Sequence, residues 1–143
     1  LLSNRSLQQE TLVSGSPVAK AWVSSRYGYR KDPFTGKTEF HSGLDFAAPT
    51  GSKVSSVAAG IVNWAGRHPE YGNMVEVKHG DGLVTRYAHN KSNLVKAGDV
   101  VKKGQVIALS GSTGRSTAPH VHFEVYKNGR VVDPASYIRR TTR

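Results

Sequence analysis

The chain has 143 residues, of which 37% are hydrophobic and 21% charged, and this length suits one domain with a buried core. It contains no cysteine, which excludes disulfides, thiolate metal sites and a cysteine nucleophile. Twenty Lys and Arg against ten Asp and Glu give a net charge of +10, which favours an anionic partner, and no apolar run is long enough to span a membrane.

Residues 1–16 show no alternating apolar pattern and end in Gly and Ser. We expect them to form a short helical or irregular lead-in, an arm or linker remnant. The chain begins at Leu1 without an initiator Met and without a signal-peptide pattern, so we expect a processed piece of a longer protein. The main domain is predicted over residues 17–143.

After Pro17, short β-type runs alternate with glycines. Gly80-Asp81-Gly82 and Asn128-Gly129 are hairpin turn signals, and Pro134 favours one helical turn over 133–137. Without a sustained 3.6-residue period, the pattern predicts an all-β fold, mainly antiparallel, with a sandwich or barrel-like sheet and a C-terminal turn. The predicted strands are 21–25, 40–46, 53–58, 60–65, 73–79, 82–89, 100–102, 105–110, 120–127 and 131–132.

Two histidines, His120 and His122, lie in the predicted strand 120–127. Side chains alternate along a strand, so both share one face with Glu124 and Tyr126, and the apolar residues between them face the core. Imidazoles about 6.6 Å apart, twice the strand rise, can converge on one small site. The alternative is a polar, solvated strand face.

A second pair, His41 and Asp45, is spaced four residues apart around Gly43. Glycine there permits a backbone bend that would point both side chains at one place. One carboxylate and one imidazole, joined by a distant imidazole, form a legitimate three-ligand zinc site with an open position for water. In the alternative, Asp45 caps a turn and His41 is incidental.

Three further histidines are less informative one at a time. His89 ends the predicted strand 82–89, His79 ends the facing strand, and His68 lies in a loop beside Pro69. A surface or strand-end position explains each of them on its own, and we assign no role to His79 or His68.

The motifs together are more specific than any one of them. HxxxD, YAH and HxH occur in this order within SSRYGYR, FHSGLDFAAPTG, YGNMVEVKHGDGLVTRYAH and VKKGQVIALSGSTGRSTAPHVHFEV. These segments resemble the lysostaphin/LytM-type zinc metalloendopeptidases, which cut peptide cross-links in bacterial cell walls. The resemblance runs from about residue 23 to residue 138.

The resemblance implies a metal centre and two catalytic groups. His41, Asp45 and His122 match the family's ligands for one Zn²⁺ per chain, and His89 and His120 match its catalytic histidines. Which of these two is the general base stays open. All five positions are filled, whereas degenerate family members have lost ligands and activate other wall enzymes.

The chemistry of such a centre implies further groups. The sequence has no HExxH glutamate, so imidazole is the natural proton carrier at neutral pH. A histidine ligand also needs an acceptor that fixes its tautomer, and Glu124 lies on the same strand face as His122. The alternative for Glu124 is an ordinary exposed strand residue.

A substrate groove is expected beside the centre. The Gly- and Ser-rich segment 110–117, which includes Ser116, leads into the histidine strand and can form a groove wall or a plain connector. It is not a phosphate-binding loop, because the Lys of that motif is missing. Tyr71, Asn73 and Arg86 are further groove candidates, with core or surface roles as alternatives.

Three other functions are compatible with parts of the sequence. A regulatory or wall-binding domain that keeps the fold would not need all five site residues. A lipoyl- or biotinyl-type carrier is suggested by VKAGDVVKKGQVIAL, but its lysines lack the flanking residues of a modified turn. Nucleic-acid binding lacks an aromatic stacking cluster, so the charge is better explained by attraction to an anionic wall matrix.

The resemblance also implies a substrate and a location. Family members cleave glycine bridges or stem-peptide cross-links, and the motif SSRYGYRKDPFTGK favours the D-Ala–diaminopimelate bond of peptidoglycan. We therefore expect the protein in the periplasm or cell envelope. We also expect an upstream regulatory region, because an unrestrained wall hydrolase is lethal.

Overall fold

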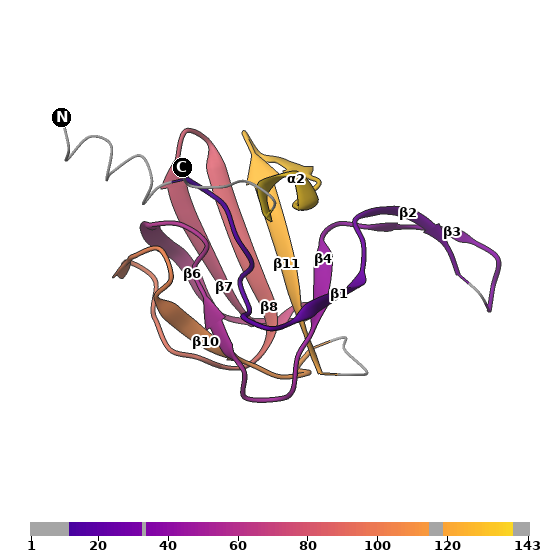
Figure 1. Ribbon diagram of the computed structural model, residues 1–143, viewed down its shortest axis with the longest axis horizontal. Helices are drawn as coiled ribbons and strands as arrows, with labels where there is room; N and C mark the ends of the chain where they lie inside the picture. Colours follow the sequence, from indigo (N-terminus) through magenta and orange to yellow (C-terminus); the bar gives the residue numbers. More distant parts are fainter. Residues whose placement is uncertain (1–11, 33, 115–118, 139–143) are drawn as a thin grey trace.

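The computed structural model describes residues 12–32, 34–114 and 119–138 (Figure 1). These ranges contain twelve strands and one short helix, α2 (Ala135–Ile138). The strands are β1 (Trp22–Ser25), β2 (Gly28–Lys31), β3 (Thr38–His41), β4 (Leu44–Ala47), β5 (Lys53–Ser55), β6 (Gly60–His68), β7 (Gly72–Gly80), β8 (Leu83–Asn93), β9 (Val100–Val101), β10 (Val106–Ser110), β11 (His120–Lys127) and β12 (Arg130–Val132).

One large antiparallel sheet forms the body of the molecule. Its strand order is β1-β4-β11-β8-β7-β6-β9, with β12 beside β11 and β10 joining both β5 and β8. Strands β2 and β3 form a separate hairpin that extends away from this body (Figure 1). The predicted all-β, mainly antiparallel fold is confirmed, and both predicted hairpin turns connect paired strands.

The core lies against one face of this sheet. In β11 the alternate residues Val121, Phe123 and Val125 are fully buried, as the strand pattern predicted. They pack with core residues of β4, β7 and β8, among them Tyr87 and Phe46. β11 lies inside the sheet, between β4 and β8. The opposite face of this strand carries His120, His122 and Glu124, so the packed core beneath the strand fixes their positions.

The predicted strand 40–46 is wrong as a single strand. β3 ends at His41 and pairs with β2, and β4 begins at Leu44 and pairs with β11. Gly43 lies at the break, where an added Cβ would come within 2.3 Å of the Phe123 carbonyl oxygen. The chain changes sheets here because only glycine lets the backbone approach β11 so closely. Strand β2 was also missed by the sequence analysis.

The described part of the lead-in, residues 12–16, contains no helix, and residues 1–11 lie outside the described residues. Val13 is nevertheless a buried member of the core. The Lys103 ammonium donates hydrogen bonds to the Leu12 carbonyl and the Ser14 hydroxyl, both at 2.7 Å. Packing against the body thus begins before Pro17. At the other end, α2 confirms the predicted helical turn.

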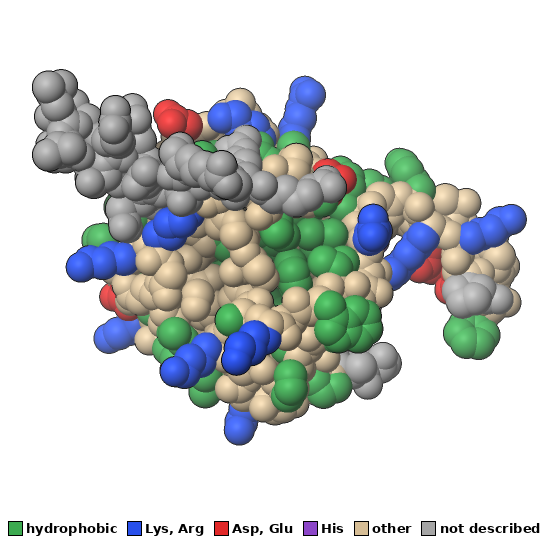
Figure 2. All heavy atoms as spheres, in the orientation of Figure 1, with side chains coloured by type: hydrophobic (Ala, Val, Ile, Leu, Met, Phe, Trp, Pro, Cys, Tyr) green, Lys and Arg blue, Asp and Glu red, His purple; other side chains and the backbone are tan. Residues whose placement is uncertain are grey.

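Positive charge is spread over the face of the molecule that Figure 2 draws. Figure 2 shows Lys and Arg side chains distributed around one face, without a single dense patch. No helix in the described part of the chain is long and apolar enough to cross a membrane. A diffuse charge of this kind attracts an anionic polymer over a wide area without specifying a nucleic-acid groove.

Replacing Gly43 by Ala is expected to lower the free energy of unfolding by about 2–3 kcal/mol, because the new methyl group overlaps backbone that cannot move alone. Urea denaturation measures the change. Gly66→Ala is the matched control, since its added Cβ meets only the Trp64 ring at 3.8 Å or more. Equal stability of the two variants would contradict the packing described for β4 and β11.

A buried polar chain connects β7 to β8 on the core side. The His79 Nδ1 donates to the Ala59 carbonyl at 2.8 Å, and its Nε2 lies 2.7 Å from the Thr85 hydroxyl. The Thr85 hydroxyl is hydrogen-bonded to the Tyr87 hydroxyl at 2.8 Å, which also accepts from the Val57 amide. Burial lowers the pKa of His79, the Ala59 carbonyl partly offsets this, and the charge of Lys103 lowers it further.

The pKa of His79 is therefore lower in the folded than in the unfolded chain, where it is about 6.5. Below that pH the unfolded chain binds more protons, so the contribution of His79 to stability is present above pH 6.5 and is lost as the pH falls. We expect His79→Gln to destabilise the protein less at pH 5.5 than at pH 7.5 in urea denaturation. A constant difference between wild type and variant would contradict this.

Candidate metal centre

Three predicted ligands come together where β3, β4 and β11 meet. The antiparallel register places His122 opposite Asp45, and the bend at Gly43 returns His41 to the same point. The Asp45 Oδ1 lies 2.7 Å from the His122 Nδ1, and its Oδ2 lies 3.2 Å from the His41 Nε2. One donor atom from each residue lies within 4.8 Å of the others, close enough to bind one metal ion.

Each imidazole of this cluster has an acceptor for its outer nitrogen. The His41 Nδ1 donates to the Arg26 carbonyl at 2.7 Å, which leaves its Nε2 toward Asp45. The His122 Nε2 lies 2.8 Å from the Glu124 carboxylate, which leaves its Nδ1 toward Asp45. Metal-binding histidines have such partners, which fix the tautomer and ring orientation. The donors available to a metal are thus His41 Nε2, an Asp45 oxygen and His122 Nδ1.

The electrostatics of the cluster favour a bound cation. Burial opposes ionisation of Asp45, but its hydrogen bonds with His122 and His41 outweigh this and hold its pKa well below the usual range. Burial also disfavours a charged His122, yet its contacts with Asp45 and Glu124 raise its pKa to about 9. The carboxylates of Asp45 and Glu124 both contact the His122 imidazole, and either a proton or a metal ion can balance their negative charge. Two imidazoles and one carboxylate form a donor set that suits zinc.

Glu124 is fully buried, so its alternative as an ordinary exposed strand residue is wrong. Its carboxylate accepts hydrogen bonds from the hydroxyls of Tyr71 and Tyr126, both at 2.9 Å, and from Ser42. Burial would raise its pKa, but its hydrogen bond and charge interaction with His122, together with the hydroxyl donors, lower it to about 2. The ionised carboxylate is held in place to accept from His122. Sequence analysis did not identify Ser42 or Tyr126 as its partners, although strand alternation put Tyr126 on this face.

The His89 side chain reaches the centre because its backbone has an unusual conformation. Strand alternation would put it on the core side with Tyr87, but its φ of 63° lies in the left-handed region and breaks the alternation. Its Nδ1 donates to the Thr113 carbonyl at 2.6 Å, so Nε2 is the nitrogen free of that bond. Burial lowers its pKa, the Thr113 carbonyl opposes this, and nearby His120 lowers it further. A neutral imidazole is favoured.

His120 lies beside His89 at the edge of the centre. Their ring centroids are 5.0 Å apart, and the His89 ring is 6.0 Å from that of His122. The His120 Nε2 is 3.7 Å from the Asp45 Oδ1, longer than the contacts of His41 and His122. Both histidines are thus adjacent to the cluster without belonging to its closest set of donors.

The predicted groove residues take different positions. The Tyr71 ring stacks on His122 at 5.9 Å between centroids, directly beside the centre. Arg86 is ion-paired with Glu76 at 2.7 Å on the same sheet face. The Asn73 amide donates to two backbone carbonyls of β8, which ties the strands together. Ser116 lies outside the described residues.

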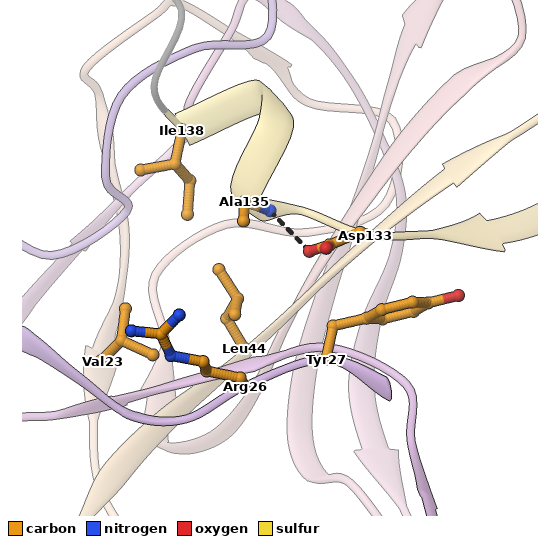
Figure 3. A pocket seen from close by; sticks show the side chains of 7 residues that line it. All are labelled: Val23, Arg26, Tyr27, Leu44, Asp133, Ala135 and Ile138. Carbon is orange, nitrogen blue, oxygen red and sulfur yellow. Dashed lines mark hydrogen bonds between the residues drawn. The ribbon is translucent and has the colours of Figure 1, made fainter. Parts of the chain in front are cut away.

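A cavity of about 400 Å³ lies behind the centre, between the β1–β2 connection and α2 (Figure 3). Arg26, whose carbonyl accepts from His41, points its side chain along this cavity. None of the four site histidines lines it, and neither does Asp45. Its lining residues are Val23, Arg26, Tyr27, Leu44, Asp133, Ala135 and Ile138.

Residues 39–134 match Peptidase family M23. DD-carboxypeptidase/endopeptidase Mpg of Neisseria meningitidis is 41% identical over 132 residues, which cover 92% of this chain and 30% of that protein. Peptidoglycan DD-endopeptidase ShyB of Vibrio cholerae is 46% identical over 120 residues, which cover 82% of this chain and 28% of that protein. The chain spans less than a third of the length of these curated relatives.

Solved structures agree with this match. A zinc containing peptidase from Vibrio cholerae superposes with a TM-score of 0.76 at 45% identity, covering 82% of this chain and 37% of that one. The catalytic domain of the antimicrobial peptidase lysostaphin from Staphylococcus simulans superposes with a TM-score of 0.75 at 33% identity. That comparison covers 84% of this chain and 93% of the lysostaphin chain.

Glu124→Gln is expected to weaken zinc binding by about 10- to 100-fold, because an amide no longer supplies the charged acceptor that orients His122. Competition with a chromogenic chelator at fixed pH measures the affinity. Glu39→Gln, on an exposed position of β3, is the control and should bind zinc like the wild type. Unchanged affinity in Glu124→Gln would contradict its contribution to the centre.

Proposed function

We propose, since the chain belongs to peptidase family M23, that it is a zinc-dependent endopeptidase that hydrolyses the D-Ala–diaminopimelate cross-links of bacterial peptidoglycan. The domain that performs this is residues 17–143. The relatives named as peptidoglycan DD-endopeptidases support the substrate class, and the zinc containing peptidase structure supports the metal.

The observation that carries the proposal is that only some of the site residues converge as metal donors, while two histidines lie beside them. Three protein donors converge from His41, Asp45 and His122, and two further histidines stand at the edge of the cluster. A structural zinc site is closed by four protein ligands, whereas a catalytic site uses three and keeps one position open. His89 and His120 then border the place where water and substrate would react.

A bound zinc ion would supply a Lewis acid that polarises the scissile carbonyl and lowers the pKa of water to about 7. His89 and His120 then divide the proton chemistry. One neutral imidazole accepts the proton of the attacking water, and the other donates to the carbonyl oxygen as it gains negative charge. The hydrogen bond from His89 to Thr113 orients its ring, and the pKa lowered by burial keeps it neutral near pH 7.

The proposed function also implies where the protein acts and what surrounds it. Peptidoglycan stem peptides place the enzyme in the periplasm or cell envelope, and a net charge of +10 attracts it to the anionic wall matrix. An upstream region of the longer protein would regulate access to the site. The filled set of five site residues favours catalysis over a degenerate domain that activates another wall enzyme.

Mass spectrometry of released muropeptides tests the bond. We expect the protein to convert dimers from diaminopimelate-type walls into monomers by cleavage between D-Ala and diaminopimelate, and to leave glycine-bridged walls intact. Chelation of zinc should abolish this. Release of glycine fragments would make it a glycine endopeptidase, and intact cross-links with stoichiometric zinc bound would contradict the enzymatic function.

Alanine variants separate the two kinds of histidine. His122→Ala should lose both zinc and activity, because it removes a donor of the cluster. His89→Ala and His120→Ala should retain zinc and lose about 10²- to 10⁴-fold in kcat. Metal content by atomic emission and kcat on a purified dimer are the two measurements. Loss of zinc in either of the latter two variants would assign that histidine to the metal instead.

A further inference from the structure

A second cavity opens on the same sheet face as the metal centre. It measures about 220 Å³ and lies over β6, β7 and β8. Its centre is an ion pair in which the Arg86 Nε donates to the Glu76 carboxylate at 2.7 Å. None of the groups assigned to metal binding or proton transfer lines it. The lining residues are Asn63, Trp64, His68, Met74, Glu76 and Arg86.

Contacts of Tyr71 and Arg86 connect the cavity to the metal centre. The Tyr71 ring stacks on His122, and the Arg86 guanidinium lies 5.9 Å from the centre of the Tyr71 ring. The Arg86 Nη1 also lies 3.7 Å from the carboxylate of Glu124, which contacts His122. Arg86 on β8 pairs with Glu124 on β11 and with Glu76 on β7, so Glu76 is two strand spacings, about 10 Å, from the histidine strand.

Both charges of the pair are partly shielded from water. The Glu76 side chain is 11% exposed and that of Arg86 28% exposed, so their interactions with a ligand are stronger than on an open surface. Asn63 donates to the second oxygen of the Glu76 carboxylate at 2.6 Å and holds it in place. The half-exposed Trp64 indole forms an apolar wall beside the pair.

Two opposite charges side by side select a ligand that carries both. A lone ammonium approaching Glu76 is repelled by Arg86, and a lone carboxylate approaching Arg86 is repelled by Glu76. An amino group and a carboxylate on one carbon can meet both partners at once. The donor stem of the proposed substrate has such a group, because the diaminopimelate before its D-Ala keeps a free amino-carboxyl end.

The reach of that side chain matches the position of the pair. Its carbon chain spans roughly 6 Å, and the residue itself begins about one residue, roughly 3.5 Å, from the scissile carbonyl. Together these lengths, roughly 9.5 Å, are comparable with the two strand spacings, about 10 Å, between the histidine strand and Glu76, measured across the sheet at Glu124. The methylenes between the two ends would lie along the Trp64 indole.

We propose that the Glu76–Arg86 cavity binds the free amino-carboxyl end of the donor diaminopimelate, with the ammonium at Glu76 and the carboxylate at Arg86. This assignment rests on the proposed function and adds the group that selects the donor stem. It makes Glu76, Arg86 and Trp64 specificity residues that act on KM, at a distance from the reacting atoms.

Three synthetic cross-linked dimers with the same acceptor stem test the assignment. Their donor residues are diaminopimelate, lysine, which lacks the carboxylate, and 2-aminopimelate, which lacks the ammonium. We expect the wild type to lose about 10-fold or more in kcat/KM on each analogue, mainly through KM, since each removes one charge-assisted contact. Equal kcat/KM on all three would overturn the subsite. Failure to cleave the diaminopimelate dimer would instead contradict the proposed function and remove the basis of the subsite.

Glu76→Gln gives a second, independent readout. It should lower kcat/KM on the diaminopimelate and lysine donors and leave the aminopimelate donor within about twofold, because only the ammonium contact is lost. A loss by the same factor on all three donors would show a structural effect and contradict the assignment. Ile61→Ala is the matched control, exposed on the neighbouring strand β6 outside the cavity, and should keep all three values.

Discussion

Strand β11 lies between β4 and β8, and its antiparallel register places His122 opposite Asp45 on one side and Ala88 on the other. The buried face of β11 fixes this register, because a slip of one residue would turn the site histidines into the core. Gly43 contributes the close approach of β4 to β11. The position of the donor atoms is thus set by hydrophobic packing on the opposite side of the sheet.

The Glu124 carboxylate connects the metal centre to the cavity around Glu76 and Arg86. A buried charge is stable only with partners, and here they are His122 on one side and the hydroxyls of Tyr71 and Tyr126 on the other. Arg86 lies over the Tyr126 ring at 4.5 Å and reaches toward the same carboxylate. The group that contacts the proposed metal donor His122 therefore also contacts the wall of the adjoining cavity, so the proposed metal centre and the proposed substrate subsite share one network.

The sequence predicted the features that depend on local pattern. The glycine turns gave two hairpins, strand alternation put His120 and His122 on one face, and the motif resemblance named all members of the cluster. The sequence did not predict the features that depend on contacts between segments far apart in the chain. The split of 40–46 into β3 and β4 depends on the approach of Gly43 to Phe123, and the left-handed His89 depends on its bond to Thr113. No local pattern reveals either.

We propose that core packing places His41, Asp45 and His122 as the donors of one zinc ion. Anomalous diffraction at the zinc edge from crystals of the zinc-loaded protein tests it directly. We expect one peak bound by the His41 Nε2, an Asp45 oxygen and the His122 Nδ1 at about 2.0–2.2 Å, with His89 and His120 beyond bonding distance. A peak held by His89 or by the Glu124 carboxylate in place of one of these donors would contradict it.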